Sequence, residues 1–414
     1  MTEQTFVVVG ASLAGAKAAE GMRDAGFQGR IVLVGDEHDQ PYERPELSKG
    51  FLKGKKEAAD LLVHEPGWYD ENRVELRLGT AVAGIHRDEH EVELAGGERL
   101  GYDRLLLATG ATPRRIEVPG ADLEGVRYLR RVGDAAALRQ IFVGGGGRLV
   151  VVGGGWIGLE VAAAARGHGV EVTVVEPQPT PLYAVLGREV GQVFADLHRA
   201  NGVDLRLGAG VASFSGGGGK VTAVTTDAGD DLKADLVVVG VGIRPNVALA
   251  EAAGLDVDNG VLVDALLASS DPDVFAAGDV ANAEHPLYGA RVRVEHWANA
   301  LNQGKAAGRN MAGAGEPYVR VPYFYTDQYD LSMEYYGYTG REGHDRVVFR
   351  GEPVGGGEWL AFWLRDGRVR AAMNVNVWDQ ADALKKLTRE QTEVDPDALA
   401  DPSVDLAGLA GSGG

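Results

Sequence analysis

The chain has 414 residues, of which 45% are hydrophobic and 24% charged, an ordinary composition for a globular protein of about two to three domains. Its 60 Asp and Glu outnumber 41 Lys and Arg, and the net charge of −19 disfavours nucleic acid and anionic membrane surfaces as partners. The absence of cysteine excludes disulfides, thiolate metal sites, Cys-ligated iron–sulfur clusters and redox-active dithiols. The N-terminus is unlike a signal peptide and no apolar run is long enough to span a bilayer, so we expect a cytoplasmic protein.

The first pattern along the chain is a strand, a glycine-rich turn and a helix. Residues 6–9 form a short β-branched run, and residues 10–15 form the turn G-x-S-x-x-G. A second apolar run at 31–34 completes a βαβ unit, and Asp36 or Glu37 at its end is placed to bind ribose hydroxyls. This unit is predicted to bind a dinucleotide, with backbone N–H groups at the helix N-terminus on the pyrophosphate.

The same pattern recurs in the middle of the chain. Residues 149–152 form the strand, and residues 153–158 form a complete G-x-G-x-x-G turn before the next helix. The following strand ends in Glu176, and no Lys or Arg appears before Arg188. A carboxylate there accepts a hydrogen bond from a ribose 2′-hydroxyl and repels a 2′-phosphate, which favours NADH over NADPH. Two such units predict FAD in the N-terminal site and NADH in the second, with a hydride passing from nicotinamide to flavin.

The remaining chain continues this organisation. A helix is expected from Trp297 to Met311. From about Pro322 the sequence becomes aromatic and shows alternating strands, such as 359–364 and 369–375, which indicates a separate α+β domain. The Asp-, Ala- and Gly-rich tail after about Val394 is expected to be frayed.

Three further strings accompany the two glycine turns. They are P-Y-E-R-P-E-L-S-K at residues 41–49, A-T-G at 108–110 and A-G-D at 277–279. With these five motifs in this order, the chain resembles the FAD-dependent NADH:ferredoxin and rubredoxin reductases of cytochrome P450 and aromatic-ring dioxygenase systems, the putidaredoxin reductase-like family. The resemblance covers residues 5–390, nearly the whole chain.

The resemblance implies a glutathione reductase-like architecture, an α/β fold with two Rossmann-like domains and a C-terminal α+β domain. A discontinuous FAD-binding domain would comprise residues 1–112 and 243–321, an NAD-binding domain 113–242, and the C-terminal domain 322–414. It also implies FAD and NADH as cofactors. The electron acceptor would be a [2Fe–2S] ferredoxin or a rubredoxin that feeds a cytochrome P450 or a ring-hydroxylating dioxygenase.

Individual residues take roles from the same resemblance. Lys49 would lie beside the flavin ring and pair with Glu160, Asp279 would hold the ribityl chain, and Trp297 would stand where a helix N-terminus meets the flavin pyrimidine. The other predicted cofactor-binding residues are Gly10, Ser12, Ala14 and Gly15 in the first turn, Asp36 at the ribose, Val82 and Arg130 at the adenine and flavin moieties, and Gly153, Gly155, Ile157, Gly158, Glu176 and Gly242 in the NADH unit.

Two positions depart from the family pattern. Ser12 replaces the middle glycine of the first turn, and little loss is expected because serine is small. Glu46 replaces a proline that is common in the R-P-P-L-S-K form of the motif, and this change is expected to loosen the loop that presents Lys49.

Hydride transfer needs the nicotinamide stacked against the flavin with water excluded, and little acid–base chemistry. The helix starting near Trp297 is the candidate to stabilise the reduced flavin through its N-terminus, although Trp297 is also explained as core packing. Lys49 and Glu160 would set the charge near flavin N5, and the alternative is an exposed ion pair of little consequence.

Without cysteine there is no thiol relay, so electrons must leave the flavin directly to an outside acceptor. Three basic clusters are candidates for docking a ferredoxin, and each is equally well explained as solvated surface. They are Lys53/Lys55/Lys56, Lys305 with Arg309, and Lys385/Lys386. His86 and His90 have the spacing of metal ligands but fall in a predicted hairpin, so no metal site is expected.

Two other functions stay open. A membrane-associated NADH:quinone oxidoreductase predicts a basic amphipathic helix at the C-terminus, whereas residues 394–414 are acidic. An NADH-sensing flavoprotein similar to apoptosis-inducing factor predicts slow turnover with every acceptor. For the oligomeric state we expect a monomer or a weak homodimer.

Overall fold

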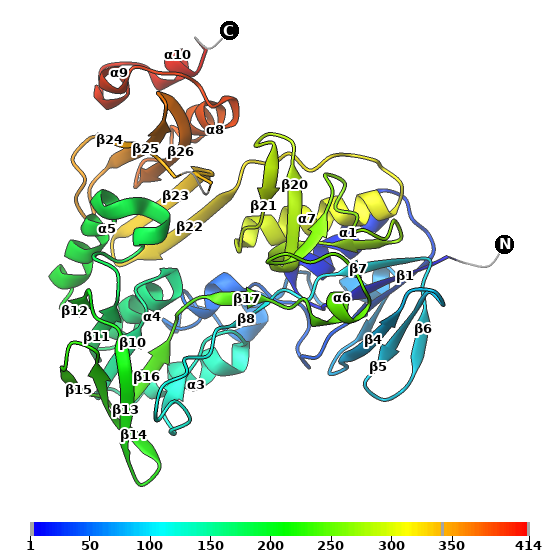
Figure 1. The fold of residues 1–414 in the computed structure, drawn as a ribbon, viewed down its shortest axis with the longest axis horizontal. Helices are drawn as coiled ribbons and strands as arrows, with labels where there is room; N and C mark the ends of the chain where they lie inside the picture. Colours follow the sequence, from blue (N-terminus) through cyan, green and yellow to red (C-terminus); the bar gives the residue numbers. More distant parts are fainter. Residues whose placement is uncertain (1–3, 341–342, 412–414) are drawn as a thin grey trace. The chain divides into compact units, whose positions relative to one another are not determined.

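The computed structural model describes residues 4–340 and 343–411, which form two compact units (Figure 1). Unit 1 comprises the residues up to Glu43, Ala59–Thr112 and Arg244–Pro322. Unit 2 comprises Arg44–Ala58, Pro113–Ile243 and the residues from Tyr323 onward. The chain passes between the units within two short strands, β8 (Ala111–Pro113) and β17 (Ile243–Pro245), and at residues 43/44, 58/59 and 322/323.

Unit 1 is built on a five-stranded parallel sheet in the order β19-β7-β1-β2-β3. Four of these strands are short apolar runs whose side chains are buried on both faces, as the interior of a parallel sheet requires, whereas the edge strand β3 is half polar and only its first residue is buried. Their bounds are β1 (Thr5–Val9), β2 (Arg30–Val34), β3 (Val74–Arg77), β7 (Arg104–Leu107) and β19 (Val274–Ala276).

Two helices of unit 1 lie side by side, α1 (Leu13–Asp24) and α7 (Trp297–Met311) (Figure 1). Their backbones approach closely because small residues face each other. A Cβ added at Gly304 or Gly308 would overlap the carbonyl oxygen of Ala14 or Ala18. The first helix and the long helix predicted at 297–311 therefore pack tightly against each other.

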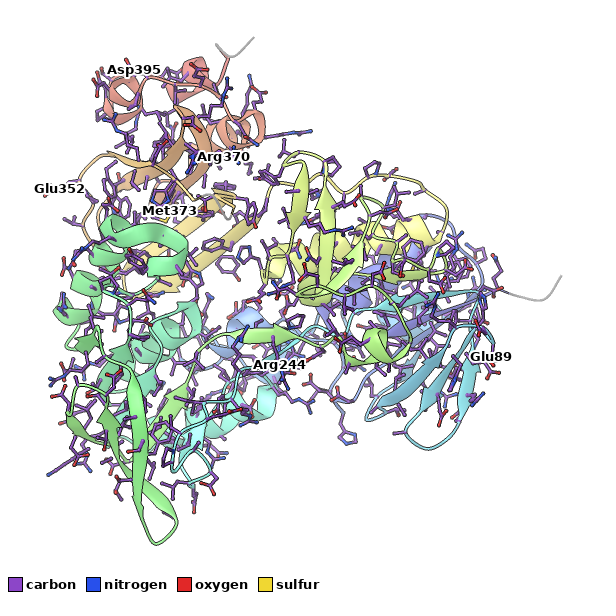
Figure 2. The ribbon with its side chains drawn as sticks, in the orientation of Figure 1. Glu89, Arg244, Glu352, Arg370, Met373 and Asp395 are labelled. Carbon is purple, nitrogen blue, oxygen red and sulfur yellow. The ribbon has the colours of Figure 1, made fainter. Side chains whose placement is uncertain are left out.

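Smaller elements complete unit 1. An antiparallel sheet joins β4 (Val82–His86), β5 (Glu91–Leu94) and β6 (Arg99–Gly101), and Glu89 lies in the turn between β4 and β5 (Figure 2). The predicted hairpin around His86 and His90 is confirmed. The other elements are η2 (Ala58–Leu61), α2 (Trp68–Glu71), α6 (Ala248–Ala252), β18 (Val261–Val263), η3 (Gly278–Val280), β20 (Ala281–His285) and β21 (Ala290–Val292).

Unit 2 contains a second parallel sheet in the order β12-β11-β10-β16-β9. The helix α4 (Trp156–Gly167) begins inside the second glycine turn, earlier than the apolar pattern alone suggested. The other bounds are β9 (Val126–Arg127), α3 (Val132–Val143), β10 (Arg148–Val152), β11 (Glu171–Glu176), α5 (Tyr183–Ala200), β12 (Asp204–Leu207) and β16 (Leu236–Val239), with an antiparallel sheet of β13 (Val211–Gly217), β14 (Lys220–Thr226) and β15 (Asp231–Lys233).

The C-terminal part of unit 2 is an antiparallel sheet in the order β22-β23-β26-β25-β24. Met373 lies in its central strand and is fully buried (Figure 2). The bounds are β22 (Tyr323–Gln328), β23 (Leu331–Gly337), β24 (Arg346–Arg350), β25 (Trp359–Arg365), β26 (Arg368–Val375) and the helix α8 (Ala381–Glu390).

The predicted frayed tail is wrong for residues 396–411. Two short helices form there, α9 (Pro396–Ala400) and α10 (Leu406–Gly411). Their apolar residues Leu399, Leu406 and Ala410 are buried in one cluster with α8 and the sheet. The Gly- and Asp-rich composition concealed these anchors, and residues 412–414 lie outside the described part of the chain.

The fold class predicted from sequence is confirmed: two parallel Rossmann-like sheets and a C-terminal α+β region occur in one chain. The domain boundaries by cofactor stay a prediction. Residues 44–58 group with unit 2, although the predicted FAD-binding range 1–112 runs through them.

Candidate functional site

The first glycine turn makes a tight passage from β1 into α1. Gly10 has a φ of +121°, and a Cβ there would overlap the carbonyl of Ala108. A Cβ at Gly15 would overlap the carbonyl of Gly10. Ser12 is the extended N-cap residue of α1, and Ala14 lies buried in the first turn of the helix. The strand, turn and helix therefore pack as a dinucleotide turn requires.

The second turn repeats this geometry between β10 and α4. Gly153 has a φ of +104°, and a Cβ at Gly158 would overlap its carbonyl oxygen. Gly155, the N-cap of α4, is different, because a Cβ there would meet no protein atom within 4 Å. The side chain of Ile157 is 44% exposed on the same turn. The space at Gly155 is where a bound pyrophosphate would need close access to backbone.

Both turns fit a dinucleotide by their electrostatics. Within the described residues, neither α1 nor α4 has a side-chain cap or an acidic residue in its first turn. The N–H groups at a helix N-terminus carry a partial positive charge and bind phosphate oxygens. Each turn can therefore hold the diphosphate of one dinucleotide.

The acids predicted at the ribose positions have different surroundings. Asp36 is exposed just after β2, and the neighbouring Glu37 accepts a hydrogen bond from Tyr42 Oη at 2.6 Å. Glu176 is buried at the end of β11 and accepts from the backbone N–H groups of Gly154 at 2.6 Å and Gln178 at 2.9 Å. These bonds fix the Glu176 carboxylate beside the glycine turn, and its remaining lone pairs can still accept from a ligand.

Lys49 and Glu160 form a buried ion pair inside unit 2. Lys49 Nζ lies 2.6 Å from Glu160 Oε1, and the side chains are 10% and 3% exposed. The alternative of an exposed ion pair is therefore wrong. Lys49 follows the short helix η1 (Arg44–Leu47), and Glu160 lies on the second turn of α4, so the R-P-E-L-S-K loop and the second glycine turn meet at this pair.

Glu46 contacts the loop that carries Lys49. Its carboxylate accepts from the backbone N–H of Gly50 at 3.1 Å and pairs with Lys56 at 3.1 Å. The expected loosening of the loop is wrong, because these contacts close the turn that carries Lys49. The glutamate supplies by side-chain bonds the constraint that a proline supplies by its ring.

The other predicted residues are divided between the units. In unit 1, Val82 opens β4, Asp279 lies in η3, and Trp297 is the first residue of α7. In unit 1 also, Gln303 of α7 accepts the Gly278 N–H at 3.0 Å, which holds the Gly-Asp turn against α7. In unit 2, Arg130 precedes α3 and Gly242 follows β16 with a φ of +97°.

The basic clusters differ in how far acids neutralise them. Lys305 contacts Glu20 and Asp24 at 2.8 and 2.7 Å, and Arg309 contacts Glu316 at 2.7 Å. That cluster is a poor candidate for attracting an acidic partner. In the first cluster Lys55 is exposed, whereas Lys56 pairs with Glu46 at 3.1 Å and the half-buried Lys53 lies 3.5 Å from the carbonyl oxygen of Asp327. Lys385 and Lys386 on α8 are exposed, and Lys385 is 3.6 Å from Asp382.

Sequence reasoning missed three polar residues around the ion pair. Ser48, Thr326 and Gln328 are buried, and the first two bond directly to Glu160. A signal for two of them was present, because Phe324, Thr326 and Gln328 alternate on the buried face of β22. A polar side chain on such a face needs a hydrogen-bonding partner.

Among residues 4–340 and 343–411, no cluster of three or more His, Asp or Glu is placed to hold a metal ion. No helix in the same residues has the length and the apolar character that crossing a bilayer demands.

Comparison with known proteins identifies the family. Residues 4–304 match the pyridine nucleotide-disulphide oxidoreductase family, and residues 323–410 match the reductase C-terminal domain. The ferredoxin–NAD(+) reductase component of the anthranilate 1,2-dioxygenase system of Burkholderia cepacia is 42% identical, over 98% of this chain and 99% of that protein. Putidaredoxin reductase of Pseudomonas putida is 39% identical, over 97% of this chain and 95% of that protein.

A solved structure agrees with the sequence relatives. The crystal structure of a covalent putidaredoxin reductase–putidaredoxin complex superposes with a TM-score of 0.94 at 38% identity, over 99% of each chain. The resemblance to the ferredoxin and rubredoxin reductases is confirmed, as are FAD and NAD(H) as the cofactors of the family. The chain belongs to the pyridine nucleotide-disulphide oxidoreductase family and, in its C-terminal part, carries the reductase C-terminal domain.

Proposed function

We propose that the chain is an NADH-dependent flavoprotein reductase that delivers single electrons to a [2Fe–2S] ferredoxin or a rubredoxin. The protein so reduced would feed a cytochrome P450 or a ring-hydroxylating dioxygenase. The observation that supports this most is the pair of uncapped dinucleotide turns in a chain without cysteine. Two dinucleotides supply the redox chemistry, and no thiol can act between the flavin and the acceptor.

Within this function, residues 1–112 and 243–321 would hold FAD, and residues 113–242 would hold NADH. The first turn, with Gly10, Ser12, Ala14 and Gly15, would bind the FAD pyrophosphate, and Asp36 its ribose. Bound FAD accepts a hydride from the reduced nicotinamide and can release its electrons one at a time. Val82, Arg130, Asp279 and Trp297 would contact the remaining parts of FAD.

The second turn, with Gly153, Gly155, Ile157 and Gly158, would hold the NADH pyrophosphate, with Gly242 close by. Glu176 would accept from a ribose hydroxyl and repel the 2′-phosphate of NADPH. Its carboxylate is already oriented by Gly154 and Gln178, so no rearrangement is needed to present that charge.

Lys49 is the proposed cation near the reacting part of the flavin. The Glu160 carboxylate holds the Lys49 ammonium in place and keeps this buried charge paired. A fixed, water-excluded ammonium stabilises negative charge that develops near it more strongly than a solvated one does.

The acceptor would dock against a local basic surface, because the net charge of −19 repels an acidic protein from most of the molecule. Lys53/Lys55/Lys56 and Lys385/Lys386 are the two clusters proposed for this role. We propose a cytoplasmic monomer or weak homodimer.

A quinone reductase is less well supported. The one basic amphipathic helix near the C-terminus of the described chain, α8, buries Leu384 and Leu387 against the C-terminal sheet. That apolar face is already covered by protein and is not available to a bilayer.

The discriminating experiment is NADH-driven reduction of cytochrome c with and without added [2Fe–2S] ferredoxin. The proposal predicts rapid reduction only when ferredoxin is present. Rapid quinone reduction without ferredoxin would favour the quinone reductase, and slow turnover with every acceptor would favour an NADH-sensing flavoprotein.

A further inference from the structure

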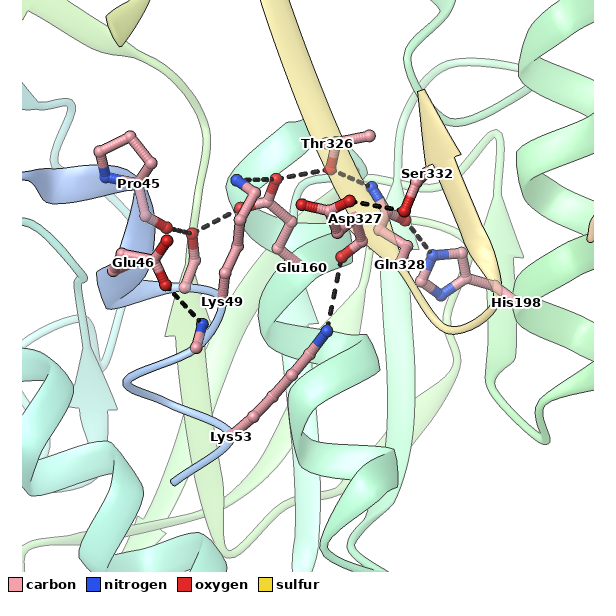
Figure 3. Close-up of polar contacts among 12 residues, drawn as sticks. Pro45, Glu46, Lys49, Lys53, Glu160, His198, Thr326, Asp327, Gln328 and Ser332 are labelled. Carbon is pink, nitrogen blue, oxygen red and sulfur yellow. Dashed lines mark hydrogen bonds and ion pairs between the residues drawn. The ribbon is translucent and has the colours of Figure 1, made fainter. Parts of the chain in front are cut away.

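The Glu160 carboxylate receives three hydrogen bonds from two separate parts of unit 2, the loop that carries Ser48 and Lys49 and the strand that carries Thr326 (Figure 3). Lys49 Nζ and Thr326 Oγ1 each lie 2.6 Å from Oε1, and Ser48 Oγ lies 2.5 Å from Oε2. Thr326 belongs to β22, in the region that matches the reductase C-terminal domain. The C-terminal domain therefore bonds directly to the ion pair.

The hydrogen bonds continue beyond Thr326 into the interior of unit 2. Gln328 Nε2 lies 3.2 Å from Thr326 Oγ1, and Gln328 Oε1 lies 2.8 Å from His198 Nε2 (Figure 3). On the far side of the imidazole, Tyr329 Oη lies 3.4 Å from His198 Nδ1. Thr326, Gln328 and His198 are each at most 1% exposed, so water does not substitute for these contacts.

Glu160 determines which group donates and which accepts in every hydrogen bond of this network. A carboxylate paired with an ammonium can only accept, so the Thr326 hydroxyl must donate to it. The Thr326 oxygen then accepts from the Gln328 NH2 group, which turns Gln328 Oε1 toward His198. The imidazole must therefore carry its proton on Nε2, and Tyr329 donates to the bare Nδ1.

The end of the hydrogen-bonded network that lies farthest from Glu160 is electrically neutral. Burial lowers the pKa of His198 to about 4, so the ring has a single proton at neutral pH. Burial also raises the pKa of Tyr329 well above its usual range, so its hydroxyl remains a donor. The network thus adds orientation to the Lys49–Glu160 pair without adding a competing charge.

We propose that Thr326, Gln328 and His198 are positioning residues for the reaction, because they fix the Glu160 carboxylate and, through it, the Lys49 ammonium. This inference rests on the proposed function for the role of Lys49. A carboxylate with one oxygen shared by Lys49 and Thr326 has lost its freedom to rotate. Without Thr326, the carboxylate keeps only the bonds from Ser48 and Lys49, which belong to one loop, so the carboxylate, the loop and the ammonium can shift together and the ammonium loses its fixed position.

The test compares Thr326→Val with Thr388→Val. Both threonines are buried in the C-terminal region, but the Thr388 hydroxyl bonds only to the carbonyls of Leu384 and Lys385 in its own helix. Thr326→Ser keeps the hydroxyl and serves as the rescue. The first readout is the 15N NMR spectrum of the histidine rings, with the His198 signal identified by its loss in His198→Asn.

In the wild type, Thr326→Ser and Thr388→Val, we expect His198 with its proton on Nε2. In Thr326→Val the Gln328 NH2 group faces a methyl group, and a buried N–H without an acceptor is costlier than a carbonyl without a donor. Gln328 therefore turns over, and the His198 proton moves to Nδ1. An unchanged His198 signal in Thr326→Val would overturn the inferred network.

The second readout is the rate of flavin reduction by NADH in an anaerobic stopped-flow experiment. Thr326→Val should slow this step about tenfold, equivalent to about 1.4 kcal/mol of transition-state stabilisation, with NADH affinity unchanged. Thr388→Val and Thr326→Ser should react like the wild type. A switched His198 proton with an unslowed reduction rate would overturn the positioning role while leaving the proposed function intact. A wild type that NADH does not reduce would instead overturn the proposed function and, with it, the catalytic part of the inference.

Discussion

Lys49 Nζ lies 2.6 Å from Glu160 Oε1, although the two residues are 111 positions apart in the chain. One residue comes from the loop after η1 and the other from α4, and both side chains are shielded from water. Burying an ion pair is costly, and Ser48 and Thr326 offset part of this cost because they donate hydrogen bonds to the same carboxylate.

Removing one partner of this pair should destabilise the protein strongly. Lys49→Met leaves a buried carboxylate without its cation, and we expect a loss of about 3 kcal/mol in the free energy of unfolding. Lys49→Met/Glu160→Gln should recover a large part of that loss, because the unpaired charge is gone. Urea unfolding measures both, with the exposed Lys386→Met as control. If Lys49→Met were as stable as Lys386→Met, Lys49 and Glu160 would not form a buried ion pair on which the fold depends.

Glu176 should select between the two nicotinamide dinucleotides. In Glu176→Arg the charge that repels a 2′-phosphate becomes one that attracts it, so the ratio of kcat/KM for NADPH to that for NADH should rise at least about tenfold. Glu171→Arg at the exposed start of the same strand is the matched control. If both variants keep the wild-type ratio, Glu176 is not the selector.

Gly155 offers a test of the second turn that leaves the fold intact. Its φ is −80°, and a Cβ there would meet no protein atom, so Gly155→Ala should be as stable as the wild type. The added methyl group would nonetheless block the approach of a pyrophosphate, and NADH affinity should fall about tenfold. Gly167→Ala, at the open end of α4, is the control in which both stability and affinity stay unchanged. Equal NADH affinity in the two variants would place the pyrophosphate elsewhere.

Stability should fall as the pH drops from about 6.5 toward 4. Burial lowers the pKa of His198 and of His296 from 6.5 to about 4, and also lowers the pKa of His64, His285 and His344. The unfolded chain therefore takes up protons in this window before the folded chain does, which weakens the fold as the pH falls. Because one pKa unit corresponds to about 1.4 kcal/mol, the lowered pKa of His198 alone accounts for a loss of about 3 kcal/mol in the free energy of unfolding across this pH range.

The measurement is the urea midpoint at a series of pH values between 7 and 4.5. His198→Gln should be less stable than the wild type at pH 7 but should lose stability less steeply. His38→Gln, at an exposed position, should keep the wild-type slope. If the stability of all three proteins falls with the same slope, the pKa of His198 does not differ between the folded and the unfolded protein.

The sequence predicted the two glycine turns and the parallel sheets because their physics is local. Gly10 and Gly153 need a positive φ, and the short β-branched runs before them need burial on both faces. The pairing of Lys49 with Glu160 came from family resemblance, since no local pattern relates a loop residue to a helix residue more than 100 positions later.

The features that the sequence did not predict depend on contacts between residues far apart in the chain. The partners of Glu160 on β22 depend on how the C-terminal sheet packs against α4 and α5 within unit 2, which residue periodicity does not specify. The prediction of a frayed tail was wrong for the same reason, because Leu399 and Leu406 pack in one cluster with residues of β24, β25 and α8. Glu46 shows the reverse case, in which a local departure from a motif is compensated by contacts with Gly50 and Lys56.

Anaerobic titration of the purified protein with NADH, followed by its visible absorption, decides whether the chain holds a flavin that NADH reduces. We expect a yellow protein whose oxidised flavin absorption is bleached by about one equivalent of NADH, since one hydride carries the two electrons that the flavin takes up. Colourless protein that takes up no FAD would contradict the proposed flavoprotein reductase. So would a yellow protein that dithionite bleaches but NADH does not.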